Sequence, residues 1–542
     1  MKKYLALFVA LLMMLAPMGA LAEETGSELN VAVGGQFTTL DPAMNTETVN
    51  SYPMGLMHAD LFDMDEAGKV TNELCESYTV SEDGLPWTFK LIDAQWSDGV
   101  AITAGDFVYS LLRTISYGTD NAWAANDMIE YIAGAEEYNL KAIEAGADFD
   151  CTVEDASSVG VKAIDDKTLE ITLTKPCAYF TKMLNSYTWA PLRPDFAVQH
   201  DGSWAYEAGY PVSGAYILAD CNENEHCIVT KNPNYFNADE VTMDTINFMC
   251  VPDQSAQAMN FQNEDIDVAL SISTETALMY EGSEELWMVA QPSNYFLAIN
   301  SGETGPEWAK NANLRRAVAL AIDKAALVEV IGGEAMYPVL NGFVPYGLSD
   351  DNGSFREAGD ADGYTLTYDP DHAKALLAQE GYDESNPLSI TYKYSNNGMH
   401  GDVATMLQAM WQAVGINVTF DAVESGVFYD QVDNSDFEIC RYGMTSGADP
   451  IGHLKLWITS KQIVPAVNDA EYDAMIEAAS LITDPAEYYT ALHAAEDYLC
   501  DNNVYVIPLF NYNTPMLVQE YVDGIRLLGG YSIDFTQATI AE

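Results

Sequence analysis

Basic residues are scarce in this chain. Among its 542 residues, 23 lysines and arginines stand against 82 aspartates and glutamates, so the formal net charge is −59. A surface this negative repels the phosphates of nucleic acids and of anionic lipids, and it attracts cations. We therefore expect no nucleic-acid partner. The excess of acidic residues has two possible explanations. The simpler one is a solvated acidic surface that keeps the protein soluble, and the other is a preference for cationic ligands.

Residues that usually carry catalysis or bind metals are also few and widely spaced. The chain has seven histidines, and no HExxH, HxH or CxxC pattern brings ligands together. Neither a GxSxG nucleophile elbow nor a phosphate-binding GxxxxGKS/T loop is present. Acidic pairs are too common to be diagnostic, and Asp165 with Asp166 is better explained as a turn. These gaps predict no catalytic residues, no metal site and no cofactor.

Long apolar runs are absent after the first 22 residues. Residues 2–22 combine two lysines, an apolar run over 4–16 and the small-residue pattern ALA at 20–22, which is typical of a signal peptide for export. No later run approaches the length of a membrane-spanning helix. No cysteine stands directly after the expected cleavage point, where the chain continues with Glu23. We therefore expect an exported protein without a lipid anchor, located in the periplasm or at the outer face of the cytoplasmic membrane.

All eight cysteines lie beyond the predicted signal peptide, where disulfides form if the compartment is oxidising. One pair stands out, because Cys221 and Cys227 flank the segment NENEH between two strand-like runs, AYILAD and IVTKN. A disulfide between them would close a hairpin. The other six fit equally well as buried thiols, and the spacing matches no zinc site.

Strand and helix patterns alternate in the second half of the chain, which indicates an α/β fold. Residues 388–395 (LSITYKYS) and 416–420 (INVTF) are predicted strands, and residues 402–414 between them carry an apolar helical stripe. Such a βαβ unit predicts a parallel sheet. Residues 315–333 (RRAVALAIDKAALVEVIGG) are predicted as a helix that ends on a glycine pair.

The first half contains a long stretch with clear boundaries. Residues 78–117 predict two strands around a glycine turn, followed by a helix. Thr103 and Asp106 form a capping box at the start of that helix, and Phe107, Leu111 and Ile115 make one apolar stripe along it. The helix should therefore begin near residue 104 and pack on the strands before it.

Several ordered segments together resemble a known family. They are LDPA at 40–43, YTVSEDGLPWTFKLIDAQWSDGVAITAGDFVYSLLRT at 78–114, PVSGAYILAD, KNPNYFN, YFLAIN, LRRAVALAIDK, YDPDHAKALLAQEGY and IPLFNY. Their order resembles that of the large peptide- and nickel-type solute-binding proteins of ABC importers, the extracytoplasmic family 5 that includes the oligopeptide-binding proteins. The resemblance covers essentially the whole chain after residue 22. So many segments in one order are far more specific than any one of them.

The resemblance implies a two-lobed α/β fold of the type II periplasmic-binding-protein-like class, with an extra third domain and a ligand cleft between the lobes. The chain would cross between the lobes twice, near residues 291–295 and 504–509. After a signal peptide at 1–22, lobe I is expected to comprise residues 23–53, 175–290 and 509–542. The extra domain is expected at 54–174, and lobe II at 291–508.

The resemblance also implies which segment holds the ammonium group of a ligand. Peptide-binding relatives carry an aspartate about four residues after the glycine of a Gly-Trp pair, because an ammonium ion buried in a closed cleft needs an anion. In YGMTSGADP (442–450) Met444 replaces the tryptophan, and the anchor position falls on Gly447. The next acidic group is Asp449. It either takes over the anchoring role or caps the helix that begins after Pro450.

Other ligand-binding candidates follow from their place in the family plan, although each also fits an ordinary loop or core position. The full set is Asn45, Thr46, Glu47 and Thr48 after LDPA, then Tyr442, Met444, Thr445, Ser446, Gly447 and Asp449, and finally Asn511 and Tyr512 after the return crossing.

The predicted function is capture of an oligopeptide or dipeptide between the lobes by hinge closure, followed by delivery to the permease subunits of an ABC importer. The protein would then act as a monomer and would make and break no covalent bond. One alternative keeps the fold but binds an oligosaccharide, a nickel chelate or a small amine. The other, a secreted hydrolase, is opposed by the missing catalytic motifs.

Overall fold

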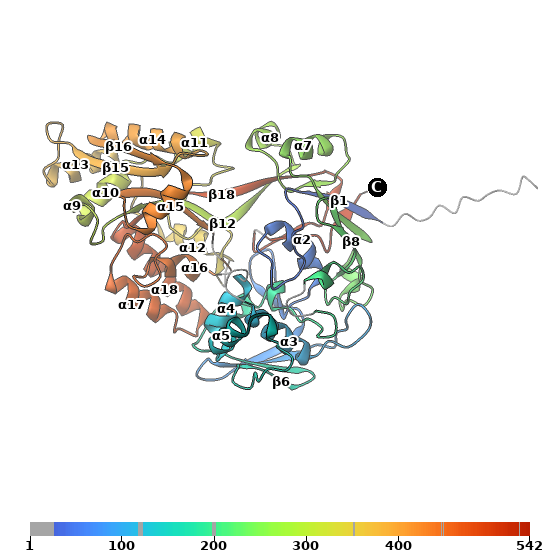
Figure 1. Ribbon diagram of the computed structural model, residues 1–542. Coiled ribbons are helices and arrows are strands. Elements are labelled where there is room, and N and C mark those ends of the chain that lie inside the picture. The colour runs from blue at the N-terminus through green and yellow to red at the C-terminus, as the bar shows by residue number, and fades with distance from the viewer. Residues whose placement is uncertain are drawn as a thin grey trace, which may run out of the picture.

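The computed structural model describes residues 27–117, 123–197, 202–350, 353–445, 447, 449–530 and 532–541. The predicted signal peptide at 1–22 lies outside these residues. Two lobes are joined by strands β12 (Leu286–Ile299) and β18 (Val506–Val518), which pair antiparallel and run from one lobe into the other (Figure 1). The predicted α/β fold with two lobes is therefore confirmed.

A single ten-stranded sheet extends through both lobes, in the order β16-β15-β17-β12-β18-β11-β1-β10-β9-β8. Its other strands are β1 (Glu28–Val33), β8 (Tyr216–Asn222), β9 (His226–Lys231), β10 (Thr245–Cys250), β11 (Val268–Ala269), β15 (Leu388–Ser395), β16 (Ile416–Val423) and β17 (Ile439–Thr445). Because β12 and β18 lie side by side near the middle, each lobe builds its own half of the sheet on one flank of this pair.

Lobe I, which contains the amino-terminal strand, builds its half around β1. This strand pairs in parallel with β10 and β11, and its residues from Leu29 to Val33 are largely buried, as expected for a strand covered on both faces. At the edge, β8 and β9 form a hairpin in which Cys221 and Cys227 are direct register partners. Both are free thiols in the structure. The predicted disulfide is therefore not formed here, although its partners face each other, and it stays a prediction.

Lobe II contains the predicted βαβ unit. Strands β15 and β16 pair in parallel along their whole length, and α14 (His400–Ala413) connects them. Val403, Leu407 and Trp411 of this helix are fully buried against the sheet. The unit confirms the prediction from periodicity.

The extra domain is a four-stranded sheet covered by helices (Figure 1). Its order is β4-β5-β7-β6, with β4 (Cys75–Val80), β5 (Pro86–Leu91), β6 (Val161–Asp165) and β7 (Thr168–Thr172). The helix α3 (Ala104–Ser116) begins at the predicted capping box of Thr103 and Asp106. Its apolar stripe is buried, with Phe107, Leu111 and Ile115 at most 1% exposed.

Two buried cationic side chains link the parts of the molecule. Arg113 of α3 makes a bidentate pair with Asp41, at 2.9 and 2.5 Å, and both side chains are 0% exposed. Lys182, in α6 (Phe180–Met183), donates from Nζ to the carbonyl of Ser349 at 2.6 Å and to Tyr489 Oη at 2.7 Å. The first contact joins the extra domain to the segment that contains Asp41, and the second joins α6 to segments expected in lobe II.

The predicted helix over 315–333 is two helices, α10 (Ala312–Leu320) and α11 (Lys324–Ile331). The break has a local cause. The Asp323 side chain accepts a hydrogen bond from the Ala326 N–H at 3.0 Å and thereby caps α11. The hydrophobic pattern continues through the break, which hides it in the sequence. The glycine pair at 332–333 does end α11, as predicted.

The remaining elements surround these sheets. The helices are α2 (Thr48–Met57), α4 (Trp123–Tyr131), α5 (Ala135–Ala145), α7 (Gln254–Gln262), α8 (Thr274–Met279), α9 (Glu307–Lys310), α12 (Phe355–Asp362), α13 (Pro370–Gln379), α15 (Ser425–Asp433), α16 (Ile451–Leu454), α17 (Ala470–Ala479) and α18 (Pro485–Asp497). The short paired strands are β2 (Phe62–Met64) with β3 (Val70–Asn72), β13 (Ser349–Asp350) with β14 (Gly353–Ser354), β19 (Val522–Asp523) with β22 (Thr539–Ile540), and β20 (Arg526–Leu528) with β21 (Ser532–Asp534). Within the described residues, no helix is long and apolar enough to cross a membrane.

Candidate functional site

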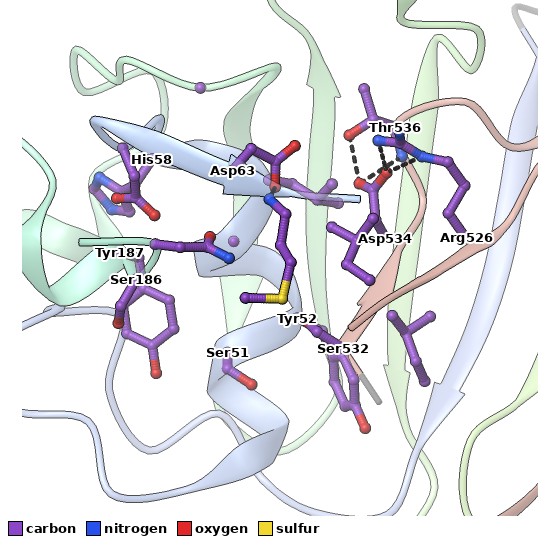
Figure 2. A pocket seen from close by; sticks show the side chains of 18 of the residues that line it. Ser51, Tyr52, His58, Asp63, Ser186, Tyr187, Arg526, Ser532, Asp534 and Thr536 are labelled. Atoms are coloured by element: carbon purple, nitrogen blue, oxygen red, sulfur yellow. Dashed lines mark hydrogen bonds and ion pairs between the residues drawn. The ribbon is translucent and has the colours of Figure 1, made fainter. Parts of the chain in front are cut away.

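A cavity of about 940 Å³ lies beside the two joining strands, mainly on the side of lobe I. Its wall contains α2, the β2–β3 hairpin, the β20–β21 hairpin and parts of β12 and β18, and Figure 2 shows several of these side chains around it. Thr445 of β17 is the contribution of lobe II. Most of the wall therefore belongs to one lobe and the extra domain, which is the arrangement expected when two lobes stand apart.

The cavity adjoins the place where the joining strands lose their regular register. Pairing between β12 and β18 is irregular between Ala290 and Asn294, and both Gln291 and Pro292 line the cavity. The fully buried Asn511 of β18 stabilises the backbone at this break in register. Its Nδ2 donates to the Gln291 carbonyl at 3.2 Å, and its Oδ1 accepts from the Tyr346 N–H at 2.9 Å. The predicted site residue Asn511 thus makes its contacts within the protein, at the crossing between the lobes.

The loop after LDPA contributes one of its four predicted residues to the cavity. Asn45 is held by the protein, since its Nδ2 donates to Tyr187 Oη at 2.7 Å and its Oδ1 accepts from Asn50 Nδ2 at 2.9 Å. Thr46 and Glu47 are exposed and lie outside the cavity lining. Thr48, the first residue of α2, lines the cavity.

The segment 442–447 also contributes one described side chain. Thr445 lines the cavity, and its Oγ1 donates to Ser293 Oγ at 3.0 Å. Met444 is 7% exposed and belongs to the hydrophobic core, and Gly447 is exposed. Ser446 lies outside the described residues.

The two predicted tyrosines, Tyr442 on β17 and Tyr512 on β18, pack among aromatic side chains. Tyr442 lies 5.9 Å from Phe296 between ring centroids, and Tyr512 lies 5.6 Å from Phe510. Both are half-buried and neither lines the cavity. Their position is that of core residues next to the crossing strands.

Asp449 is a buried carboxylate whose oxygens are occupied. It is 3% exposed. Its Oδ1 accepts from Tyr488 Oη at 2.6 Å and from the Ile451 N–H at 3.0 Å, and its Oδ2 accepts from Tyr489 Oη at 2.9 Å. Burial raises the pKa of this carboxyl, and the charge of Lys182 opposes that rise. Of the two roles considered above, these contacts favour helix capping.

Sequence reasoning missed an acidic wall on the other side of the cavity. Asp60, Asp63 and Glu73 come from the β2–β3 hairpin and its flanks, and all three line the cavity. In Figure 2, Asp63 and Asp534 lie next to each other, and dashed lines join Asp534 to Arg526. That ion pair has distances of 3.0 and 2.6 Å. With the exposed Glu240, the cavity lining therefore carries five carboxylates beside one arginine, which is already paired.

Burial and mutual repulsion perturb these carboxylates in the empty cavity. Burial raises the pKa of Asp60 well above its usual range, and the charges of Glu73 and Asp63 raise it further. Burial also raises the pKa of Glu73 to about 8, with Asp63 adding to the rise and the Asp60 N–H and Tyr235 hydroxyl opposing it. Burial raises the pKa of Asp63 as well. A cation in this position would reverse all three shifts, because it stabilises the ionised form.

The sequence held one faint signal of this wall. Asp60 stands between apolar residues in HADLF, a context in which an acidic side chain is often buried. With 82 acidic residues in the chain, that signal did not stand out. The contacts to segments near residues 235 and 534 cannot be read from local patterns at all.

The rest of the cavity wall carries hydroxyl groups and apolar side chains. Among the described residues, no group of three or more His, Cys, Asp or Glu side chains has a geometry that could hold a metal ion. The described part of the chain also offers an acidic, partly apolar cavity wall with tyrosines and serines, such as Tyr52, Tyr187, Ser51 and Ser186 in Figure 2. Such a wall suits reversible binding of a solute.

Comparison with known proteins gives a consistent result. A family model described as "Bacterial extracellular solute-binding proteins, family 5 Middle" matches residues 69–463. The periplasmic oligopeptide-binding protein OppA of Escherichia coli (strain K12) is 26% identical over 503 residues, which cover 91% of this chain and 88% of that protein.

Two solved structures share the fold. The first is "MppA Periplasmic Murein Tripeptide Binding Protein, Unliganded Open Form", with a TM-score of 0.80 at 22% identity, covering 92% of this chain and 94% of that one. The second is "Listeria monocytogenes OppA bound to peptide", with a TM-score of 0.65 at 22% identity, covering 96% of this chain and 100% of that one. The chain thus superposes better on the open, unliganded protein than on the peptide-bound one.

Proposed function

This chain belongs to the bacterial extracellular solute-binding proteins of family 5, and we propose that it captures a peptide between its two lobes and delivers it to the permease subunits of an ABC importer. The central event is hinge closure, in which binding stabilises a closed form that the permease recognises. No covalent bond changes in this cycle. The proposed location is outside the cytoplasmic membrane, as the name of the E. coli relative states for that protein.

The position of the cavity over the joining strands carries this proposal. Two adjacent strands cross between the lobes, and their register breaks at residues that line the cavity. A solute held there contacts the point about which the lobes would rotate, so binding and closure are coupled by geometry. The higher TM-score against an open, unliganded relative supports an open resting state for this chain.

The size of the cavity and the names of the relatives both favour a peptide as the solute. The volume of about 940 Å³ lies near the upper end of ordinary ligand pockets, roughly 300–1,000 Å³, and leaves room for water around side chains. The printed names of the relatives describe peptide binders, which favours the same cargo class here.

The test uses the mature protein and defined pools of solutes. A pool of short peptides and a separate pool of oligosaccharides are incubated with the protein, and native mass spectrometry identifies what remains bound. Chromatography with mass detection follows the composition of each pool over time. We expect one-to-one peptide complexes and unchanged pools. Complexes with saccharides alone would overturn the peptide cargo, and new hydrolysis products would overturn the binding-only function.

A further inference from the structure

One carboxylate in the cavity wall has no partner of its own. The Asp60 side chain is 7% exposed, and its Oδ1 atom has no hydrogen-bond partner among the described residues. Its neighbour Glu73 differs, because both Glu73 oxygens accept hydrogen bonds, from the Asp60 N–H at 2.7 Å and from Tyr235 Oη at 3.1 Å. Asp63 accepts at Oδ1 from the Met64 N–H at 2.7 Å. Among these three carboxylates of the described residues, Asp60 alone has a buried oxygen without a hydrogen-bond donor.

An unpaired buried carboxylate is costly, and proteins rarely keep one without a use. Burying an acceptor without a donor costs about 1–3 kcal/mol, and more when the group is charged. In addition, His58 lines the same cavity, is 3% exposed, and has an Nδ1 atom without a partner in the described structure. Two unpartnered polar atoms in the lining of one cavity, one of them an acidic oxygen, indicate a ligand that supplies the missing hydrogen bonds.

The acidic side chains of the cavity wall favour a ligand whose hydrogen-bond donors carry a positive charge. Asp60, Asp63 and Glu73 lie together, while the nearest arginine, Arg526, is engaged by Asp534 at 3.0 and 2.6 Å. The complement of such a wall is a compact cation with several N–H donors. A primary ammonium group has three donors and one positive charge.

We propose that Asp60, with Asp63 and Glu73, forms a subsite for a primary ammonium group of the bound solute. The subsite rests on the proposed solute-binding function and narrows its ligands to cations. It lies on the side of the cavity formed by the extra domain. The sequence-predicted anchor positions are unsuited to this role, because Gly447 offers no charge and both oxygens of Asp449 accept hydrogen bonds. In this protein, the ammonium group is held by the β2–β3 hairpin.

Calorimetry with three probes tests the subsite near neutral pH. Trialanine carries a free amino terminus, N-acetyl-trialanine has the same chain without that charge, and spermidine carries ammonium groups without a peptide. The wild type is compared with Asp60→Asn, and Glu66→Gln serves as the matched control. Glu66 is exposed, lies outside the cavity lining and follows β2 in the same hairpin, so its removal changes the local field by one charge without touching the subsite.

We expect acetylation of trialanine, and Asp60→Asn, each to weaken binding at least about tenfold, with Glu66→Gln within about twofold of wild type. A third outcome is that neither tripeptide binds, while spermidine binds the wild type and binds Asp60→Asn more weakly. This outcome would support the subsite and overturn the peptide cargo. Equal binding of trialanine and its acetylated form, or trialanine binding unchanged in Asp60→Asn, leaves peptide binding intact and overturns the subsite. Failure of all three probes to bind the wild type also overturns it.

Folding controls separate a binding defect from a damaged protein. Because Asp60→Asn removes a buried carboxylate whose Oδ1 has no donor, the variant should unfold at a urea concentration no lower than that of the wild type. A less stable variant would mean that the Asp60 carboxylate supports the fold itself, which contradicts its assignment to the ligand.

Discussion

Asp449→Asn distinguishes a helix cap from a ligand anchor. The asparagine keeps an oxygen where Oδ1 accepts from Tyr488 and Ile451, at 2.6 and 3.0 Å. It places an N–H₂ group where Oδ2 accepts from Tyr489 at 2.9 Å, while Lys182 also donates to that hydroxyl at 2.7 Å. The Tyr489 hydroxyl then meets two donors. One charged hydrogen bond is lost, so we expect a loss of about 1–2 kcal/mol in the free energy of unfolding.

Alanine at the same position gives the upper limit of this effect. Asp449→Ala removes all three hydrogen bonds and leaves buried tyrosine hydroxyls without their acceptor, so about 3–5 kcal/mol should be lost. Urea unfolding followed by tryptophan fluorescence measures both variants, and calorimetry with trialanine measures the affinity of Asp449→Asn, which should stay within about threefold of wild type.

The opposite order of effects would identify Asp449 as the ligand anchor. An affinity that falls at least about tenfold in Asp449→Asn, together with unchanged stability, would show that this carboxylate holds the ligand. Asp60→Asn supplies the comparison, because we expect it to lose affinity and keep stability. The two substitutions are the same chemical change at two buried aspartates, so opposite outcomes cannot arise from the change itself.

Three further predictions concern Glu73, the ion pair of Asp41 with Arg113, and the two cysteines of the β8–β9 hairpin. Burial raises the pKa of Glu73 from 4.5 to about 8, so its protonated form favours the fold, and that stabilisation is full below about pH 4.5 and is lost as the pH rises toward about 8. The whole pKa shift would correspond to about 5 kcal/mol in the free energy of unfolding, but because the side chain is half-buried we expect a change of roughly 2 kcal/mol. Urea unfolding of the wild type and of Glu73→Gln at several pH values measures this change. A difference in stability between the two proteins that does not vary with pH would contradict the prediction. Asp41→Asn breaks the buried pair with Arg113 and should cost about 3–5 kcal/mol in urea unfolding without changing trialanine affinity, whereas a stable variant would mean that the pair is dispensable. Mild oxidation should remove two titratable thiols from the wild type and none from Cys221→Ser, because Cys221 and Cys227 are register partners that can form a disulfide. An equal loss of thiols in both proteins would exclude this pairing.

Local patterns predicted the elements whose boundaries are set by neighbouring residues. The capping box at Thr103 and Asp106 and the βαβ unit around α14 appear where the sequence places them, because both depend on residues within one or two turns. The helix break before Lys324 was missed although its cap, Asp323, is visible. The apolar pattern continues across the break, so the periodicity alone does not show that one helix ends and another begins.

The candidate site depended on contacts between distant segments. The partners of Asp449 are Tyr488 and Tyr489, about forty residues downstream, so no local pattern separates a cap from an anchor. The acidic wall joins residues 60–73 to Tyr235 and to the β20–β21 hairpin. The family resemblance named Thr48 and Thr445 as candidates, and both line the cavity. It gave no information about Asp60, because the burial of that side chain depends on the folded chain.

Closure on a solute is the central claim, and small-angle X-ray scattering tests it most directly. The radius of gyration of the mature protein is measured alone and with a saturating concentration of the solute identified by native mass spectrometry. We predict that the empty protein exceeds the value of roughly 24 Å typical of a compact chain of this length, and that the bound protein falls toward it. An unchanged radius of gyration with the cavity occupied would contradict the account.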